Sequence, residues 1–166
     1  MCAHCQRAEQ SRQLESSSLV QATQPEWMKN AVLYEVNIRQ YTPEGTFSAF
    51  QNHLPRLKEL GVDILWLMPI HPIGKEKRKG TLGSVYAVQD YYAIHAGMGT
   101  QEEFRALVRA IHEAGMYVLM DWAASATAWD HVLTESHSDW YLHDDAGNFI
   151  TPEYMGQSDV IALDYN

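Results

Sequence analysis

The chain has 166 residues, is 46% hydrophobic and 11% aromatic, and carries a net charge of -9 with a pI near 5.2. This length corresponds to about one domain, and the apolar content is enough for a core, which excludes a wholly disordered chain. The negative charge would repel phosphates, so we expect neither a nucleic-acid partner nor an anionic membrane surface. No apolar run approaches the roughly 20 residues that a membrane span requires, so no transmembrane segment is predicted.

Residues 1–26 are rich in Gln, Ser and charged side chains, which predicts a flexible leader. Cys2 and Cys5 lie in this leader on either side of His4. We interpret them as two tail thiols and leave three alternatives open: a metal chelate with His4, a redox pair, or the remnant of a lipid-anchored secretion signal. As encoded, the chain is expected in the cytoplasm. It would be periplasmic or lipid-anchored if a signal segment upstream of Cys2 or Cys5 has been lost.

Two strands with a helix between them are predicted after the leader. Residues 31–38 contain β-branched and aromatic side chains, and residues 63–70 form a nearly continuous apolar run, as in a strand buried on both faces. Between them, apolar side chains at helical spacing predict a helix over residues 47–60. We expect Pro55 to bend this helix and Gly61 to end it.

A loop, a second helix and a third strand follow. The charged run at residues 75–79 is expected to be a solvated loop. Thr100 and Glu103 have the spacing of a capping box, which predicts the start of a helix that Gly115 ends. Residues 117–121 then read as an apolar strand. The order strand, helix, strand, helix, strand predicts an α/β fold with parallel strands and right-handed crossovers.

Asp121 is the main candidate for chemistry. It ends the third predicted strand, and parallel α/β folds place their active sites where buried strands surface. Small and mostly inert side chains follow it, at Ala123, Ala124, Ser125 and Ala126. The sequence therefore predicts the frame of a catalytic crevice that has lost part of its functional groups.

Several segments together resemble the alpha-amylase family of glycoside hydrolases, over about residues 27–166. The resemblance is carried by AVLYEVNIRQYTPEGTF (31–47), HLPRLKELGVDILWLMPIHPIG (53–74), KGTLGSVYAVQDYYAI (79–94), GMYVLMDWAASATAWDH (115–131), WYLHDDAGNF (140–149) and DVIALDYN (159–166). Within the family, the chain is most similar to bacterial enzymes that act on α-1,4-glucans or short maltodextrins. The resemblance implies a partial (β/α)8 TIM barrel. Residues 27–125 would supply its first three β/α units, and residues 126–166 the excursion after the third strand, which resembles the family's domain B.

The resemblance also implies a retaining mechanism. In the family, an aspartate nucleophile follows the fourth strand, a glutamate general acid/base follows the fifth, and a second aspartate follows the seventh. We expect all three acids to lie outside this chain. The chain would then hold no confident catalytic residue and would have no glycosidase turnover alone.

The family's first conserved region, Asp-x-x-x-Asn-His, matches this sequence only in part. Asp121 stands at the aspartate, which organises the site, while Ser125 and Ala126 replace the asparagine and histidine. No cofactor is expected, because the calcium ion that the asparagine often supports is disfavoured by Ser125. Tyr86 matches the tyrosine that stacks on the sugar. The structural alternatives are that Asp121 caps the strand end and that Tyr86 is ordinary core or rim.

Four further residues are candidates for substrate binding. His71 ends the second strand, and Trp129, Asp130 and His131 would form a sugar-facing rim. The alternatives are a packing role for His71 and a buried Trp129 with its polar neighbours turned outward. The histidines at 131, 137 and 143 recur every six residues, which suits neither one helical face nor a hairpin chelate, so no metal site is predicted.

Three functions remain open. The first is a truncated glycoside hydrolase segment of α-glucan metabolism, complete only with a C-terminal half. The second is a non-catalytic module that binds carbohydrate or self-associates. The third is an unrelated ester or lactone hydrolase, with or without metal assistance, on an opened barrel. We favour a homo-oligomer, because three strands alone leave open edges and an exposed inner face. The expected members of that inner face include Leu65, Leu67, Val118 and Met120.

Overall fold

The computed structural model describes residues 24–152 and 156–165. Its contacts divide the chain into two compact units, Met1–Ala31 and Val32–Asn166. In the first unit, the 3-10 helix η1 (Glu26–Met28) is followed by Lys29, whose Nζ lies 2.6 Å from the Glu26 Oε1. Residues 1–23 of the predicted leader, with Cys2 and Cys5, lie outside the described residues. The domain boundaries proposed from the sequence stay predictions.

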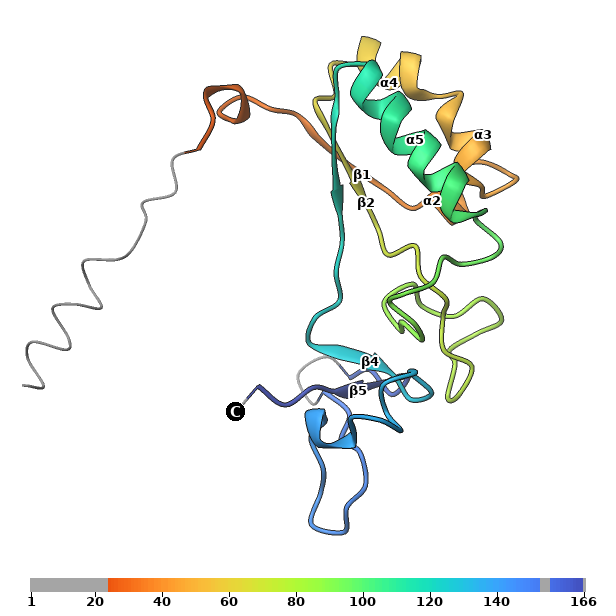
Figure 1. The fold of residues 1–166 in the computed structure, drawn as a ribbon, viewed down its shortest axis with the longest axis vertical. Helices are drawn as coiled ribbons and strands as arrows, with labels where there is room; N and C mark the ends of the chain where they lie inside the picture. The colour runs from red at the N-terminus through yellow and green to blue at the C-terminus, as the bar shows by residue number, and fades with distance from the viewer. Residues whose placement is uncertain (1–23, 153–155, 166) are drawn as a thin grey trace, which may run out of the picture. The chain divides into compact units, whose positions relative to one another are not determined.

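The second unit is built on a parallel sheet with the strand order β1-β2-β3 (Figure 1). Its strands are β1 (Leu33–Val36), β2 (Ile64–Leu67) and β3 (Tyr117–Met120), each shorter than the predicted apolar run. Both neighbouring pairs are parallel, as the alternation of strands and helices predicted. The carboxyl ends of all three strands therefore lie at one edge of the sheet.

Two departures from the predicted elements have local causes. The predicted first strand ends at Val36, and a short helix α2 (Ile38–Tyr41) follows. The predicted single helix over residues 47–60 is two helices, α3 (Phe47–Gln51) and α4 (Leu54–Glu59). Proline is tolerated in the first turn of a helix, where its missing N–H would have no intrahelical partner. Pro55 occupies the first turn of α4, so the helix restarts there and does not bend.

Helix α5 (Gln101–Glu113) has the predicted capping box. The Thr100 hydroxyl accepts a hydrogen bond from the Glu103 N–H at 3.2 Å, and the Glu103 carboxylate accepts one from the Thr100 N–H at 2.7 Å. Gly115 follows with φ of 70°, a left-handed conformation that glycine adopts at little cost. After Gly115 the chain enters β3, and Asp121 directly follows this strand at the edge of the sheet.

The helices cover one face of the sheet (Figure 1). Leu65 and Leu67 of β2 are fully buried in one apolar cluster with Leu107 and Ile111 of α5. The same cluster includes Phe47, Phe50, Leu54 and Leu57 from α3 and α4. Leu65 and Leu67 therefore face the helices, and their assignment to the barrel's inner face was wrong.

The opposite face of the sheet carries the alternate residues of each strand. Leu33 is in register with Ile64, which is in register with Tyr117, and Leu119 lies next along β3 beside Trp66. The exposed fractions of Leu33, Tyr117 and Leu119 are 45%, 46% and 50%. The prediction of exposed apolar surface on the sheet is thus confirmed, with Met120 also 47% exposed, but Leu65 and Leu67 do not belong to it.

The excursion after β3 contains an antiparallel pair, β4 (Ala126–Ala128) with β5 (Val160–Ala162), and the 3-10 helix η2 (Ser138–Trp140). A second, smaller core joins this pair to the loop after β2. Its members are Ile73, Val85, Ala87, Ala126, Ala128 and Val160. Among the described residues, none of the helices has the length and apolar character needed to cross a bilayer.

Candidate functional site

The site begins at the residue directly after β3. The Asp121 N–H donates to the Leu67 carbonyl at 2.8 Å, which extends the parallel ladder by one residue. The Asp121 Oδ2 accepts a hydrogen bond from the Tyr86 hydroxyl at 2.8 Å. Burial, with the hydrogen bond to Asp121, raises the pKa of Tyr86 to about 12. The structure thus joins two of the predicted site residues, a neutral phenol and a carboxyl group, at the carboxyl edge of the sheet.

Tyr86 also lines a cavity of about 240 Å³, of which Asp121 is not a lining residue. Its lining consists of Tyr86, Ala123, Ser125, Ala126, Gln157 and Val160. The small side chains of residues 123–126 make room here without supplying an imidazole or a carboxylate. A ligand in this space would lie against the Tyr86 ring and between the end of β3 and the start of β5.

His71 is not in this cavity. Its Nδ1 lies 3.0 Å from the Ala93 carbonyl oxygen, and its ring packs edge-on against Tyr91, with the centroids 5.6 Å apart. It lines a different hollow, of about 530 Å³, together with Ile94, Phe104 and other residues of the α5 side. The structure therefore separates His71 from Tyr86 and Asp121.

His131 lies inside the excursion. Its exposed fraction is 1%, and its Nδ1 accepts a hydrogen bond from the Leu133 N–H at 3.1 Å. Burial lowers the pKa of His131, and the charges of Asp90 and Asp130 oppose that shift. The Tyr91 ring packs on the imidazole with the centroids 5.0 Å apart. This placement makes His131 a packing residue in the structure.

Tyr91 is a structural residue that the sequence analysis did not single out. Its hydroxyl donates to the Ala123 carbonyl, two residues after Asp121, and its ring contacts both His71 and His131. Burial raises the pKa of Tyr91 to about 12, so the hydroxyl keeps its proton for this bond at neutral pH. In the sequence, only the aromatic character of Tyr91 within the segment 79–94 indicated that it could have such a structural role.

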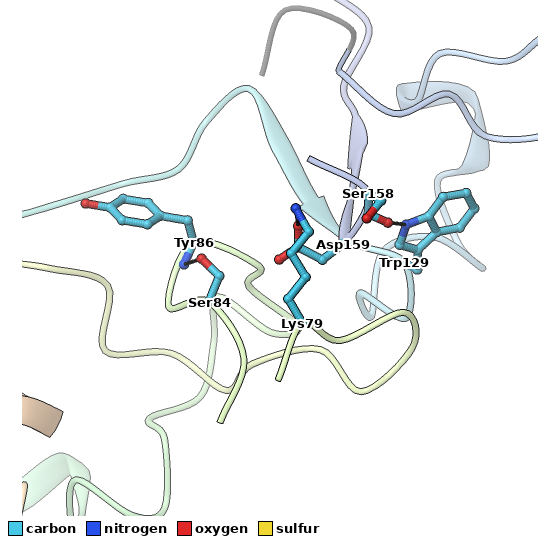
Figure 2. A network of polar contacts seen from close by, with 6 residues as sticks. All are labelled: Lys79, Ser84, Tyr86, Trp129, Ser158 and Asp159. Carbon is cyan, nitrogen blue, oxygen red and sulfur yellow. Dashed lines mark hydrogen bonds and ion pairs between the residues drawn. The ribbon is translucent and has the colours of Figure 1, made fainter. Parts of the chain in front are cut away.

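Trp129 and Asp130, predicted as a sugar-facing rim, are engaged within the protein. The Trp129 Nε1 donates to the Ser158 carbonyl at 3.0 Å (Figure 2). The Lys77 Nζ lies 2.9 Å from the centre of the indole ring. The Asp130 Oδ2 accepts hydrogen bonds from the Lys75 N–H at 2.9 Å and from the Gln89 Nε2 at 2.8 Å. One indole face is thus covered by a lysine.

The charged run at residues 75–79 was predicted as a solvated loop, and it is a loop in which Lys75, Glu76, Lys77 and Lys79 are exposed. The Lys79 Nζ lies 3.1 Å from the Asp159 Oδ1, and Figure 2 shows the lysine reaching from its loop to that carboxylate. The Arg78 guanidinium donates to the Gly74 and Ile73 carbonyls at 2.6 and 2.7 Å. Charge composition predicted the exposure of this loop, but it did not predict the pairing of Lys79 with Asp159 on the excursion.

A third hollow, of about 560 Å³, was not predicted. Its walls are mainly aromatic, from Tyr91, Tyr92, Trp122, Trp140, Tyr141 and Tyr165. Trp122 lines it while Ala123 and Ser125 line the cavity of Tyr86, so the segment after Asp121 separates the two spaces.

In the described parts of the chain, no three His, Cys, Asp or Glu side chains gather closely enough to hold a metal ion. The backbone carbonyl of Ser125 accepts a hydrogen bond from the Leu163 N–H at 3.0 Å, as part of the pairing with β5. The expectation about calcium is not tested by this arrangement and stays a prediction.

The three parallel strands, with Asp121 and Tyr86 joined at their carboxyl edge, have the arrangement of an α/β fold and agree with part of a β/α barrel. The chain matches the profile of the alpha amylase catalytic domain over residues 13–158. The chain therefore belongs to the alpha-amylase family, which confirms the resemblance stated from the sequence.

Individual relatives agree with this assignment. The chain is 38% identical over 129 residues to an alpha-1,4-glucan:maltose-1-phosphate maltosyltransferase of Rhodospirillum rubrum, covering 67% of this chain and 19% of that protein. It is 34% identical over 110 residues to alpha-amylase 3 of Dictyoglomus thermophilum, covering 63% of this chain and 21% of that protein.

Solved structures give the same result. An alpha-amylase of Lactobacillus plantarum superposes with a TM-score of 0.79 at 45% identity, over 82% of this chain and 32% of that one. A maltogenic alpha-amylase of Thermotoga neapolitana superposes with a TM-score of 0.77 at 44% identity, over 83% and 33%. The chain thus spans about a fifth of the length of these curated relatives and about a third of these solved structures.

Proposed function

We propose that this chain forms the sugar-binding wall of an alpha-amylase-family site for α-1,4-glucans or maltodextrins. The observation that carries the proposal is the hydrogen bond between Tyr86 and Asp121 at the carboxyl edge of the three parallel strands. The relatives are a transferase named for alpha-1,4-glucan and several alpha-amylases, which supports this substrate class. In this proposal, β1, β2 and β3 are the first three strands of the barrel.

The roles of the two residues follow from their geometry. Tyr86 presents a ring to the cavity, and aromatic faces bind the apolar face of a sugar ring. Asp121 holds the Tyr86 hydroxyl and so fixes the tilt of that ring. Ala126 leaves space where the family has a histidine, so we expect weak binding, because one hydrogen-bond donor to the sugar is missing.

Binding is tested by titrating the purified chain with maltoheptaose in a calorimeter. We expect measurable heat with the native chain and weaker binding in Tyr86→Ala, because this variant removes the aromatic ring proposed to contact the sugar. Tyr92→Ala is the matched control, because Tyr92 is 84% exposed and lines other hollows. No heat from a folded native chain would contradict the proposal.

We further propose that the chain does not hydrolyse glycosides alone. The family's nucleophile and general acid/base follow the fourth and fifth strands, and retention requires two carboxyl groups about 5 Å apart. The described sheet has three strands. Release of nitrophenol from a nitrophenyl maltoside that is lost in Asp121→Asn would show turnover on this chain's own carboxyl groups and contradict this part of the proposal.

The exposed sheet face supports self-association as a further part of the proposal. Leu33, Tyr117 and Leu119 are about half exposed on one face, and burying such apolar surface contributes about 25 cal/mol per Å². A second copy or a C-terminal half of the barrel would cover them. A strictly monomeric, cooperatively melting species in sedimentation experiments would contradict self-association. The unrelated ester or lactone hydrolase is not favoured, since the relatives are glucan-acting proteins.

A further inference from the structure

The loop at residues 74–79 contacts the excursion through every second residue, at positions 75, 77 and 79. The Lys75 N–H donates to the Asp130 carboxylate, at 2.9 and 3.2 Å from its two oxygens. The Lys77 ammonium lies over the Trp129 ring, and the Lys79 ammonium pairs with Asp159 (Figure 2). One backbone N–H and two lysine side chains of this loop therefore contact Trp129, Asp130 and Asp159 of the excursion.

The ion pair at the end of this loop has unequal exposure. The Asp159 side chain is 5% exposed, and the Lys79 side chain is 49% exposed. A carboxylate so deeply buried requires a partner, since the loss of one member of a buried pair leaves an uncompensated charge. The exposed lysine is the member that can leave, so salt in the solvent reaches the contact from its side.

Lys77 has an unusual backbone conformation. Its φ is 51°, and it is the non-glycine residue with positive φ in the described part of the chain. A side chain other than glycine is disfavoured there, and such conformations persist where surrounding contacts hold them. Here the contact is the Trp129 ring, whose Nε1 also donates to the Ser158 carbonyl. Trp129 therefore connects the loop to the residue before Asp159.

These contacts lie next to the cavity of Tyr86. Gln157 and Val160 line that cavity and flank the pair Ser158 and Asp159 in the chain. The later part of β5 is held by backbone hydrogen bonds, from Leu163 N to Ser125 O and from Ala162 N to Ile150 O. The start of β5 depends instead on the loop contacts, on its ladder with β4 and on the small second core.

We propose that residues 74–79 form an electrostatic clasp that fixes the start of β5 and thereby sets one wall of the Tyr86 cavity. Lys79 and Lys77 are positioning residues: they do not touch the cavity, but they hold the segment 157–160 that does. The clasp exists whether or not sugar binds. Its effect on sugar affinity rests on the function proposed above.

The test is hydrogen exchange of the whole chain, followed by mass spectrometry of peptides that cover 156–165 and the β1–β3 sheet. We expect Lys79→Met to speed exchange in 156–165 about tenfold or more, since the buried Asp159 loses its partner. Exchange in the sheet should stay as in the native chain. Lys75→Met is the matched control, because it removes the same charge from the same loop while its contacting group is the backbone N–H.

Two further variants separate the ion pair from a general loss of structure. Lys79→Arg keeps the charge and should restore native exchange. Lys79→Met combined with Asp159→Asn removes both charges and should exchange more slowly in 156–165 than Lys79→Met alone. Unchanged exchange in Lys79→Met, equal acceleration in Lys75→Met, or no relief in the double variant would overturn the clasp.

Calorimetry with maltoheptaose then tests the link to the site. We expect weaker binding in Lys79→Met than in Lys75→Met, with recovery in Lys79→Arg. Equal affinities in all variants would overturn the effect on the cavity wall. No binding by the native chain would overturn the proposed function, while the exchange experiment would still decide on the clasp.

Discussion

The sheet with its helices and the excursion are held together in different ways. The helix-covered side of the sheet packs large apolar side chains, among them Phe47, Phe50 and Leu107, into one buried cluster. The excursion has a core that includes three alanines, and its contacts to the neighbouring loop include Asp130 and Asp159. Burial of apolar surface therefore stabilises the sheet with its helices, whereas close backbone approach and specific polar pairs position the excursion.

The largest expected effect tests the first half of this comparison. Leu65→Ala should lower the free energy of unfolding by about 2–5 kcal/mol, because it opens a cavity in the cluster that covers the sheet. Denaturant unfolding followed by circular dichroism measures the change. Leu82→Ala is the control: this side chain is 63% exposed outside the sheet, and its loss should cost less than about 0.5 kcal/mol. Equal losses in the two variants would contradict the dominant role of the buried cluster.

An intermediate effect is expected where the loop approaches the excursion. A Cβ at position 74 would lie 2.3 Å from the Ala128 Cβ and 2.6 Å from the Asp130 Oδ1. Gly74→Ala should therefore destabilise by about 1–3 kcal/mol through overcrowding, with faster hydrogen exchange in β4. For comparison, a Cβ at Gly97 meets the His95 ring at 3.1 Å, so Gly97→Ala should perturb less. A harmless Gly74→Ala would show that the contact is looser than described.

The smallest expected effect is a pH dependence that arises in the excursion. Burial lowers the pKa of His131 below its ordinary value of about 6.5. As the pH falls through that value, the unfolded chain binds the proton before the folded chain does. The stability is therefore complete above about pH 6.5 and decreases as the pH falls below it. Thermal melting between pH 7.5 and 5.5 should show this decrease.

Two variants test whether His131 causes this pH dependence of stability. His131→Gln should flatten the decrease in part, because burial and the charges of Arg39 and Arg78 also lower the pKa of His95, which contributes with the same sign. His112→Gln, on the exposed side of α5, is the control and should leave the slope as it is. A slope unaffected by His131→Gln would contradict the assignment.

The sequence predicted regular elements well where a local rule applied. The capping box at Thr100, the end of α5 at Gly115 and the three parallel strands are in the structure because hydrophobic period and cap chemistry act over a few residues. The face of β2 that carries Leu65 was assigned wrongly. A strand with apolar residues on both sides offers no alternation from which to choose the helix-covered face.

The candidate site was predictable only in part. The family resemblance singled out Tyr86 and Asp121, and the structure joins them with a hydrogen bond. The sequence also suggested a sugar-facing rim of Trp129, Asp130 and His131. In the structure, Trp129 contacts Lys77 and Asp130 contacts Lys75. Composition describes how charges prefer water, but it does not say which charge finds a partner.

By itself, the sequence determined the family, the parallel α/β order and the position of Asp121 at a strand end, because these depend on motifs and on short-range periodicity. The tertiary structure alone decided which sheet face is covered, where His131 lies and that Lys79 pairs with Asp159. Those contacts join residues far apart in the chain, so they follow from how the segments pack and not from any local pattern.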